Sequence, residues 1–148
     1  MLFRSVDGQP QQAVAGEPQL PPHKLYKMKC FLDKLLPKYS SEWIGRQWLA
    51  IDEQMIPYRG RVGFRQFVAN KPNRFGIKVW AMADATNGYI LQQQIYTGKT
   101  LEQANPEVGL GIRVVLDLTQ GYDHKGHIVV TDNFYTSPIL AQKLQNRA

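Results

Sequence analysis

One segment constrains this chain most strongly, because an apolar run in it ends in two carboxylates and a long basic stretch follows. The run at 48–51 leads directly into Asp52 and Glu53, and no acidic residue occurs from 54 to 83. An apolar run of this kind predicts a buried strand, which we place at 47–53. A carboxylate at the end of such a strand is a hard oxygen ligand that suits Mg²⁺.

The segment that follows the two carboxylates is basic and rich in aromatic residues. Its basic residues are Arg59, Arg61, Arg65, Lys71, Arg74 and Lys78, and its aromatic residues include Tyr58, Phe64, Phe67, Phe75 and Trp80. Guanidinium groups pair with phosphates and aromatic rings stack on bases, so the segment favours contact with DNA. A solvated charged face is the other interpretation of such a run.

The whole composition limits what this chain can be. Its 148 residues suit one domain, and a formal charge of +6 with a pI near 9.5 favours an anionic partner. Cys30 is the only cysteine, which excludes an internal disulfide or a cysteine zinc site, and we expect it to be buried in a helix. No apolar run has the length of a membrane span, so we predict a soluble intracellular protein with no membrane partner.

The chain before the first strand divides into two parts. Residues 1–22 are rich in Gln, Pro and Gly, which predicts a flexible leader, and we expect the ordered domain over 23–148. From about Lys24, apolar residues recur at helical spacing as far as Pro37. We expect the helix to end at that proline, since proline removes a backbone donor.

Two strands joined by a tight turn follow the basic segment. The runs 77–83 and 89–96 flank Asn87-Gly88, which is a strong hairpin signal. We interpret Asp84, at the end of the first of these runs, as a turn residue.

A helix, a short strand and a second helix complete the pattern. Apolar spacing predicts the first helix over 107–119. The solidly apolar run 127–131 predicts a strand that is buried on both faces and ends at Asp132. Ser137 followed by Pro138 predicts a helix start, with serine as the cap and proline as the first helical residue.

This order of elements predicts an α/β fold with a mixed sheet: three antiparallel strands, a helix, a parallel strand and a helix. If the strand at 127–131 lies beside the first strand and parallel to it, Asp52 and Asp132 meet at one edge of the sheet. Two such carboxylates can share divalent metal ions for phosphoryl transfer. Glu53 should point to the opposite face, because side chains alternate along a strand.

Two histidines are the other candidate metal ligands. His124 and His127 are three residues apart beside Asp123. A turn joins them to a strand, so the helical spacing that would aim both rings at one ion is absent. We therefore expect His124 to be an ordinary loop residue and His127 to begin the strand. We also expect Asp117, within the predicted helix, to be solvated.

Several ordered blocks of sequence resemble the piggyBac-type transposases, which are DDE enzymes of the IS4-like group. The block at 49–61 (LAIDEQMIPYRGR) contains Asp52 and resembles the first catalytic-aspartate block of that family. The blocks at 64–67, 71–72, 76–80 and 96–99 continue it, and 130–137 (VTDNFYTS) looks like the second aspartate block. The resemblance runs from about His23 to the end of the chain.

The resemblance implies a ribonuclease H-like core that cuts and joins DNA at TTAA targets with Mg²⁺. It implies that Asp52 and Asp132 are catalytic metal ligands, the first two of three aspartates. The basic residues of the family motif become the expected phosphate contacts, namely Arg59, Arg61, Arg65, Lys71 and Lys78. The implied partner is double-stranded DNA, at transposon ends and TTAA targets. The implied location is the nucleus, and a homodimer is left open.

The third aspartate of the family belongs to a later helix, beyond Ala148, so we expect a ribonuclease H-like sheet that is incomplete at its C-terminal side. We therefore expect a fragment of a cut-and-paste transposase, or of a transposase-derived protein, that does not cleave DNA by itself. A domesticated DNA-binding protein without catalysis and a non-functional transposon remnant are the alternatives. Salt-dependent DNA binding and cooperative melting would separate them.

Overall fold

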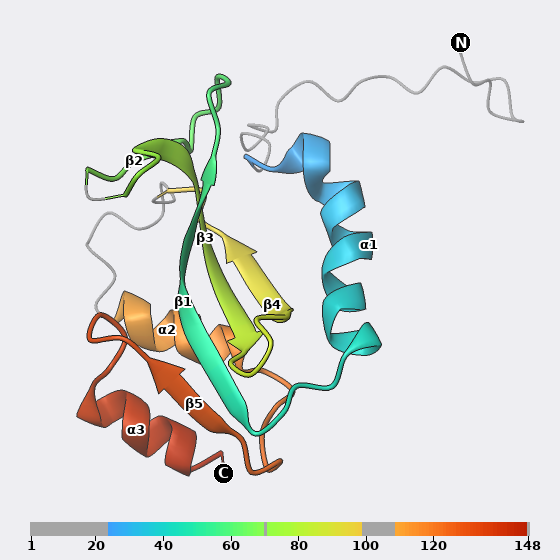
Figure 1. The fold of residues 1–148 in the computed structure, drawn as a ribbon, viewed down its shortest axis with the longest axis vertical. Helices are drawn as coiled ribbons and strands as arrows, with labels where there is room; N and C mark the ends of the chain where they lie inside the picture. Colours follow the sequence, from blue (N-terminus) through green and yellow to red (C-terminus); the bar gives the residue numbers. More distant parts are fainter. Residues whose placement is uncertain (1–23, 70, 99–108, 148) are drawn as a thin grey trace, which may run out of the picture.

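The computed structural model describes residues 24–69, 71–98 and 109–147, and the leader expected at 1–22 lies outside them. The elements follow in the order α1 (Tyr26–Glu42), β1 (Trp48–Pro57), β2 (Gln66–Phe67), β3 (Phe75–Asp84), β4 (Ile90–Ile95), α2 (Leu110–Leu118), β5 (Ile128–Thr131) and α3 (Pro138–Gln145) (Figure 1). This is the predicted order with one short strand, β2, added. No helix within the described ranges is long and apolar enough to cross a membrane.

A five-stranded mixed sheet organises the structure. Its order is β2-β3-β1-β5, and β4 also pairs with β3. β1 is antiparallel to β3 and parallel to β5, with Ile51 in register with Thr131. The parallel pairing of the first and last strands is therefore the predicted one.

The main core lies between the sheet and helices α2 and α3. Leu49 and Ile51 of β1 pack there with Val114, Val115 and Leu118 of α2. These β1 residues alternate with less buried ones, as expected for a strand with one covered face. α1 packs instead along β4, as Figure 1 shows, and none of its residues is fully buried.

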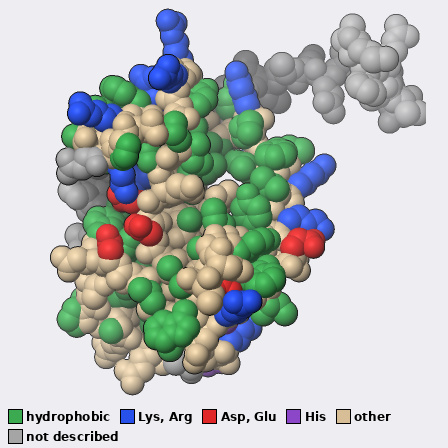
Figure 2. All heavy atoms as spheres, in the orientation of Figure 1, with side chains coloured by type: hydrophobic (Ala, Val, Ile, Leu, Met, Phe, Trp, Pro, Cys, Tyr) green, Lys and Arg blue, Asp and Glu red, His purple; other side chains and the backbone are tan. Residues whose placement is uncertain are grey.

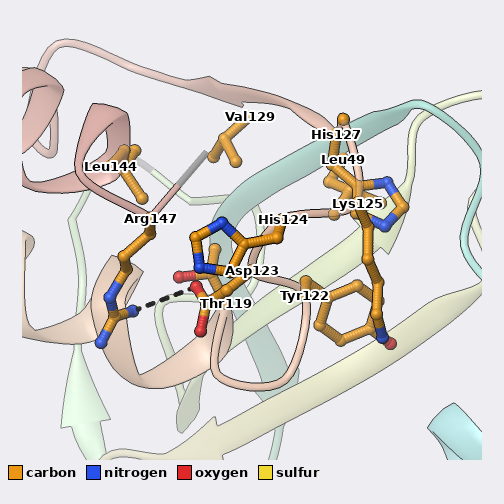
Figure 3. A pocket seen from close by; sticks show the side chains of 11 residues that line it. Leu49, Thr119, Tyr122, Asp123, His124, Lys125, His127, Val129, Leu144 and Arg147 are labelled. Carbon is orange, nitrogen blue, oxygen red and sulfur yellow. Dashed lines mark ion pairs between the residues drawn. The ribbon is translucent and has the colours of Figure 1, made fainter.

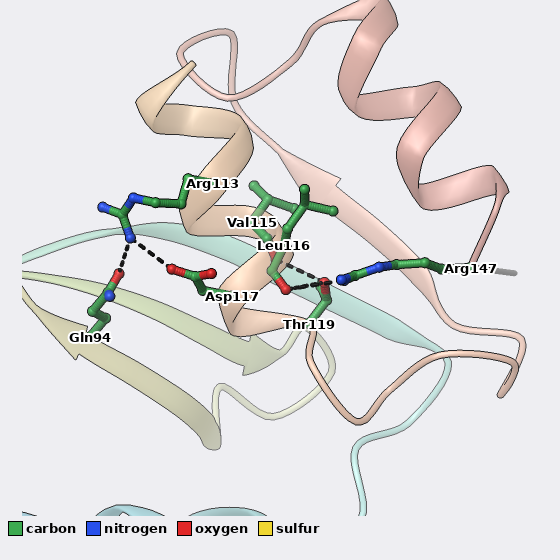
Figure 4. A network of polar contacts seen from close by, with 7 residues as sticks. All are labelled: Gln94, Arg113, Val115, Leu116, Asp117, Thr119 and Arg147. Atoms are coloured by element: carbon green, nitrogen blue, oxygen red, sulfur yellow. Dashed lines mark hydrogen bonds and ion pairs between the residues drawn. The ribbon is translucent and has the colours of Figure 1, made fainter. Parts of the chain in front are cut away.

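Polar contacts fix α2 to its neighbours (Figure 4). The Arg113 guanidinium donates to Asp117 one turn along at 2.7 Å and to Gln94 of β4 at 3.4 Å. Arg147, just after α3, donates to the carbonyl of Leu116 at 3.2 Å. These contacts link α2 to β4 and to the residue after α3. Asp117 is exposed as predicted, although it is ion-paired.

Two predictions about the first helix are wrong. Pro37 lies inside α1, and the helix continues to Glu42. The proline is exposed, so water can reach the carbonyl that loses its helical donor. Cys30 is exposed as well, in a helix that has no fully buried residue.

The prediction that the last strand is buried on both faces is also wrong. Ile128 and Val130 are exposed, while Val129 packs against the core. β5 pairs only with β1 and lies at the edge of the sheet as far as the described residues show. One face of β5 is therefore covered and the other is open.

Candidate metal and nucleic-acid site

Asp52 and Asp132 are brought together by the parallel pairing of β1 and β5. In the β1–β5 pairing each directly follows the last residue in register, Ile51 or Thr131. The expected end of the first strand at 53 is wrong, because β1 continues to Pro57 and Asp52 also pairs with Ala81 of β3. Because the strands are in register, both carboxylates belong to the same face of the sheet, the face opposite α2. Both side chains are exposed. In Figure 2, acidic side chains gather on the visible face where β1 and β5 meet.

The backbone orients each carboxylate through one oxygen. Asp52 Oδ1 accepts a hydrogen bond from the amide of Glu53 at 2.6 Å. Asp132 Oδ1 accepts one from the amide of Phe134 at 3.0 Å. The second oxygen of each carboxylate takes no part in these bonds.

This pair of carboxylates fits a divalent cation such as Mg²⁺. Mg²⁺ is commonly held by one or two carboxylates and keeps several waters, or takes phosphate oxygens, as its other ligands. Among the residues that the structure describes, no three His, Cys, Asp or Glu side chains converge as a complete metal site would. Within the described ranges, Asp52 and Asp132 are thus a pair of carboxylates without a third possible ligand beside them.

Glu53 is directed away from the pair and is neutralised by lysines. Its carboxylate lies 2.7 Å from Lys78 Nζ and 3.9 Å from Lys71 Nζ. The Lys78 ammonium also lies 5.8 Å from the ring centroid of Trp80 and 5.7 Å from that of Phe134. Lys78 thus connects β1, β3 and the turn after β5.

Tyr135, three residues after Asp132, is a buried core residue that the sequence did not single out. Burial raises the pKa of its hydroxyl, and the negative charges of Glu53, Asp52 and Asp132 raise it further. Within the described ranges, the Tyr135 hydroxyl and the Trp80 indole N–H are the buried side-chain groups without a hydrogen-bond partner. The phenol is therefore held in its neutral form.

The five predicted phosphate contacts fall into two groups. Arg59, Arg61 and Arg65 are exposed on the segment 58–65 between β1 and β2, which we call the arginine loop. Figure 2 shows Lys and Arg side chains at this end of the molecule. Lys71 and Lys78 lie instead beside Glu53. The structure thus separates residues that the sequence presents as one tract.

The aromatic residues of the basic segment also fall into two groups, which differ in their exposure. Phe64 and Trp80 are buried, and Trp80 belongs to the main core. Tyr58, Phe67 and Phe75 are exposed. Three of the five interleaved aromatic residues are therefore available to a ligand, and the other two are structural.

Asp84 has a larger role than the predicted turn. Its buried carboxylate accepts hydrogen bonds from the hydroxyl and amide of Thr86, from Trp43 Nε1 at 3.2 Å and from the amide of Arg46 at 3.1 Å. The Thr86 hydroxyl bond and these other donors hold the pKa of Asp84 well below its usual range, although burial opposes them. Asp84 thereby fixes the chain that enters β1.

The two histidines lie in a different place, around a pocket of about 80 Å³ between the α2–β5 loop and the end of α3 (Figure 3). His127 Nδ1 lies 3.0 Å from the carbonyl oxygen of Arg46. Asp123 forms an ion pair with Arg147 at 3.8 Å. The carboxylate nearest to His124 is therefore already paired. The pocket lies near the start of β1, away from Asp52.

The sequence is similar to those of known transposases and transposase-derived proteins. The family described as Transposase IS4 matches residues 9–148. The human PiggyBac transposable element-derived protein 3 is 35% identical over 130 residues, which cover 85% of this chain and 22% of that protein. The human chimeric ERCC6-PGBD3 protein is likewise 35% identical over 130 residues, which cover 85% of this chain and 12% of that protein.

The fold is similar to that of a solved transposase. The cryo-electron microscopy structure of the piggyBac transposase synaptic complex with hairpin DNA has a TM-score of 0.74 and 28% sequence identity, over 82% of this chain and 25% of that chain. This likeness confirms the predicted ribonuclease H-like fold. The chain spans a quarter or less of the length of these relatives. It belongs to the IS4 transposase family and, within that family, to the piggyBac-type transposases.

Proposed function

We propose that this chain binds DNA and supplies two metal ligands, Asp52 and Asp132, of a piggyBac-type strand-cleavage centre. The observation that carries the proposal is the in-register parallel pairing of β1 and β5, which sets these two carboxylates side by side. The similar piggyBac transposase forms a synaptic complex with hairpin DNA, which supports DNA as the partner here. A nuclear location follows from a DNA substrate.

Each part of the site has a separate task in this proposal. Asp52 and Asp132 hold Mg²⁺, which when bound would activate water and polarise a phosphate. Backbone amides keep one oxygen of each carboxylate in place. The arginine loop binds phosphates of the same DNA molecule, because its guanidinium groups are exposed and carry donors in a fixed geometry.

The proposed substrate is double-stranded DNA with transposon ends and TTAA target sites, as in the family. Strand cleavage in the family uses three aspartates, and no group of three possible metal ligands occurs among the described residues. We therefore expect the 148-residue chain to leave supercoiled plasmid intact in the presence of Mg²⁺. Nicking that requires both Mg²⁺ and Asp52 would contradict this expectation.

DNA binding through the arginine loop is tested by its dependence on salt. We expect the affinity for a labelled duplex to fall steeply with salt in the wild-type chain. The slope of the logarithm of the binding constant against the logarithm of the salt concentration should be smaller in magnitude for the double variant R59A/R61A. The reduction should be roughly 2, about one for each lost phosphate contact. The matched control is K29A/K38A on the exposed side of α1, which should keep the wild-type slope. An unchanged slope in R59A/R61A would remove the loop from the binding site.

A DNA-binding protein that does not cleave is the second candidate function. It is favoured by the separation of the two sites, since Asp52 and the end of β1 at Pro57 are about 17 Å apart along the strand. DNA binding by the arginine loop should then persist without the carboxylates. The double variant D52N/D132N is expected to keep wild-type duplex affinity in a metal-free buffer, and a loss of affinity there would exclude this candidate.

A further inference from the structure

Two exposed aromatic rings lie together at the edge of the sheet. Phe67 of β2 and Phe75 of β3 are directly opposite each other in the strand pairing. Their ring centroids are 4.9 Å apart with an interplanar angle of 50°, and the residues are 57% and 52% exposed. The two rings thus form a small exposed apolar patch. We call Phe67 and Phe75 the aromatic pair.

The surroundings of the aromatic pair are strongly basic. The Arg65 guanidinium lies 5.2 Å from the ring centroid of Phe75. Arg65 also donates to the carbonyls of Arg59 and Gly60, both at 3.4 Å, and so joins the arginine loop to the pair. Arg74 is exposed beside Phe75, and no acidic residue occurs between 54 and 83. The surface therefore combines flat apolar rings with positive charge.

The aromatic pair belongs to the same face of the sheet as the acidic site. In the β1–β3 register, Asp52 is opposite Ala81 and Ile56 is opposite Ile77. Side chains alternate along β3, so Phe75 falls on the face of Ala81 and hence of Asp52. The distance along β1 from Asp52 to Pro57, which pairs beside Phe75, is about 17 Å. This is about five steps of a DNA strand at 3.4 Å each.

We propose that the aromatic pair and the arginine loop bind unpaired DNA bases, about five nucleotides from the position of the two carboxylates. The rings offer stacking surfaces, and the arginines offer phosphate contacts on the adjoining backbone. Bases within a closed duplex are already stacked and hidden, so the rings add affinity only where a strand is open. The inference rests on the proposed function, which identifies the anionic partner as DNA.

The test compares an oligonucleotide strand with its duplex. Binding of a labelled 12-nucleotide single strand and of the matched duplex is measured for the wild-type chain and for F67A/F75A. The variant should lose about 5- to 100-fold in affinity for the single strand, and its affinity for the duplex should stay within about twofold. F31A is the matched control, because Phe31 on α1 is equally exposed at 57%, and both its affinities should be those of the wild type.

A second variant separates stacking from folding. F67W/F75W keeps a flat ring at both positions and should retain wild-type affinity for the single strand. A strand that carries 2-aminopurine should also lose fluorescence on binding the wild-type chain, but not on binding F67A/F75A, because a stacked base is quenched.

The possible failures can be told apart. If the wild-type chain binds duplex and F67A/F75A binds the single strand equally well, this inference fails and the proposed function stands. If F67A/F75A loses affinity for strand and duplex alike, the rings do not select unpaired bases and the inference also fails. If the wild-type chain binds neither form of DNA, both the inference and the proposed function are wrong.

Discussion

At the scale of single residues, three aspartates that follow apolar runs have two different environments. Asp52 and Asp132 are exposed, and each accepts one backbone hydrogen bond. Asp84 is fully buried and accepts four hydrogen bonds from three residues, two of which, Trp43 and Arg46, precede β1. The first two aspartates are therefore open to a ligand, whereas Asp84 is a structural anchor.

The Asp84→Asn substitution should destabilise the chain and change its response to acid. The pKa of Asp84 is lower in the folded state than the value of about 3.9 for an unfolded chain. The group thus contributes stability above that pH, and the contribution is lost as the pH falls through the folded-state value. Melting temperatures measured by circular dichroism at pH 7 and pH 3 should differ less in D84N than in the wild-type chain. D33N, on exposed α1, should behave as the wild type, and equal acid sensitivity of D84N would contradict the assignment.

The role of Asp84 also shows which information the sequence lacked. The sequence places all three aspartates correctly at the ends of apolar runs. It does not show that Trp43 and Arg46 return to Asp84, because those contacts join residues about forty positions apart. The sequence does contain one relevant signal, Thr86, two residues after Asp84. Aspartate side chains in turns commonly accept a hydrogen bond from the residue two positions later, as Asp84 does here.

At the scale of elements, two contacts hold the turn after β5 in place. Lys78 of β3 bonds Glu53 of β1, and its ammonium lies over the ring of Phe134. On the other side, α2 approaches the turn at Gly111, where an added Cβ would lie 2.9 Å from the carbonyl oxygen of Phe134. Because the amide of Phe134 orients Asp132, both contacts position the candidate ligand.

The ion pair between Glu53 and Lys78 should contribute measurably to stability. Both side chains are less than a third exposed, so the pair is screened less than a surface pair. A double-mutant cycle with E53Q and K78M, followed by urea unfolding, should give a coupling free energy of about 1 kcal/mol. The exposed pair Lys29–Asp33 should give less than about 0.5 kcal/mol in the same cycle. Equal couplings would mean that Lys78 is as free as a surface lysine.

The close approach of α2 predicts that Gly111→Ala is unfavourable. Alanine normally stabilises a helix by about 1 kcal/mol relative to glycine. Here the added methyl group would press on backbone atoms of Phe134 and Tyr135, in the turn after β5. Such overpacking costs about 1–3 kcal/mol. We expect a net loss of about 1 kcal/mol in urea unfolding. Gly63→Ala is the control, because nothing lies within 4 Å of the position that its methyl group would take, and a stabilised G111A would contradict the close contact.

At the scale of the whole molecule, the sequence predicts the architecture well and the surfaces poorly. Apolar runs and the Asn87-Gly88 turn are enough for the element order and the parallel pairing of β1 with β5. The positions of the basic residues could not be predicted in this way. Once β3 folds back beside β1, Lys71 and Lys78 lie beside Glu53, whereas the arginines stay in the arginine loop. The exposure of β5 could not be predicted either, since an apolar run does not show which neighbours cover it.

The central claim is that Asp52 and Asp132 together hold one divalent cation. The most direct measurement is electron paramagnetic resonance of Mn²⁺ titrated into the chain, with Mg²⁺ as competitor. We expect the wild-type chain to remove one equivalent of Mn²⁺ from the free-ion signal and Mg²⁺ to restore that signal. D52N and D132N should each lose this binding, while D117N, altered at an exposed aspartate on α2, should keep it. A free-ion signal that is the same for the wild-type chain and for D52N and D132N would contradict the account.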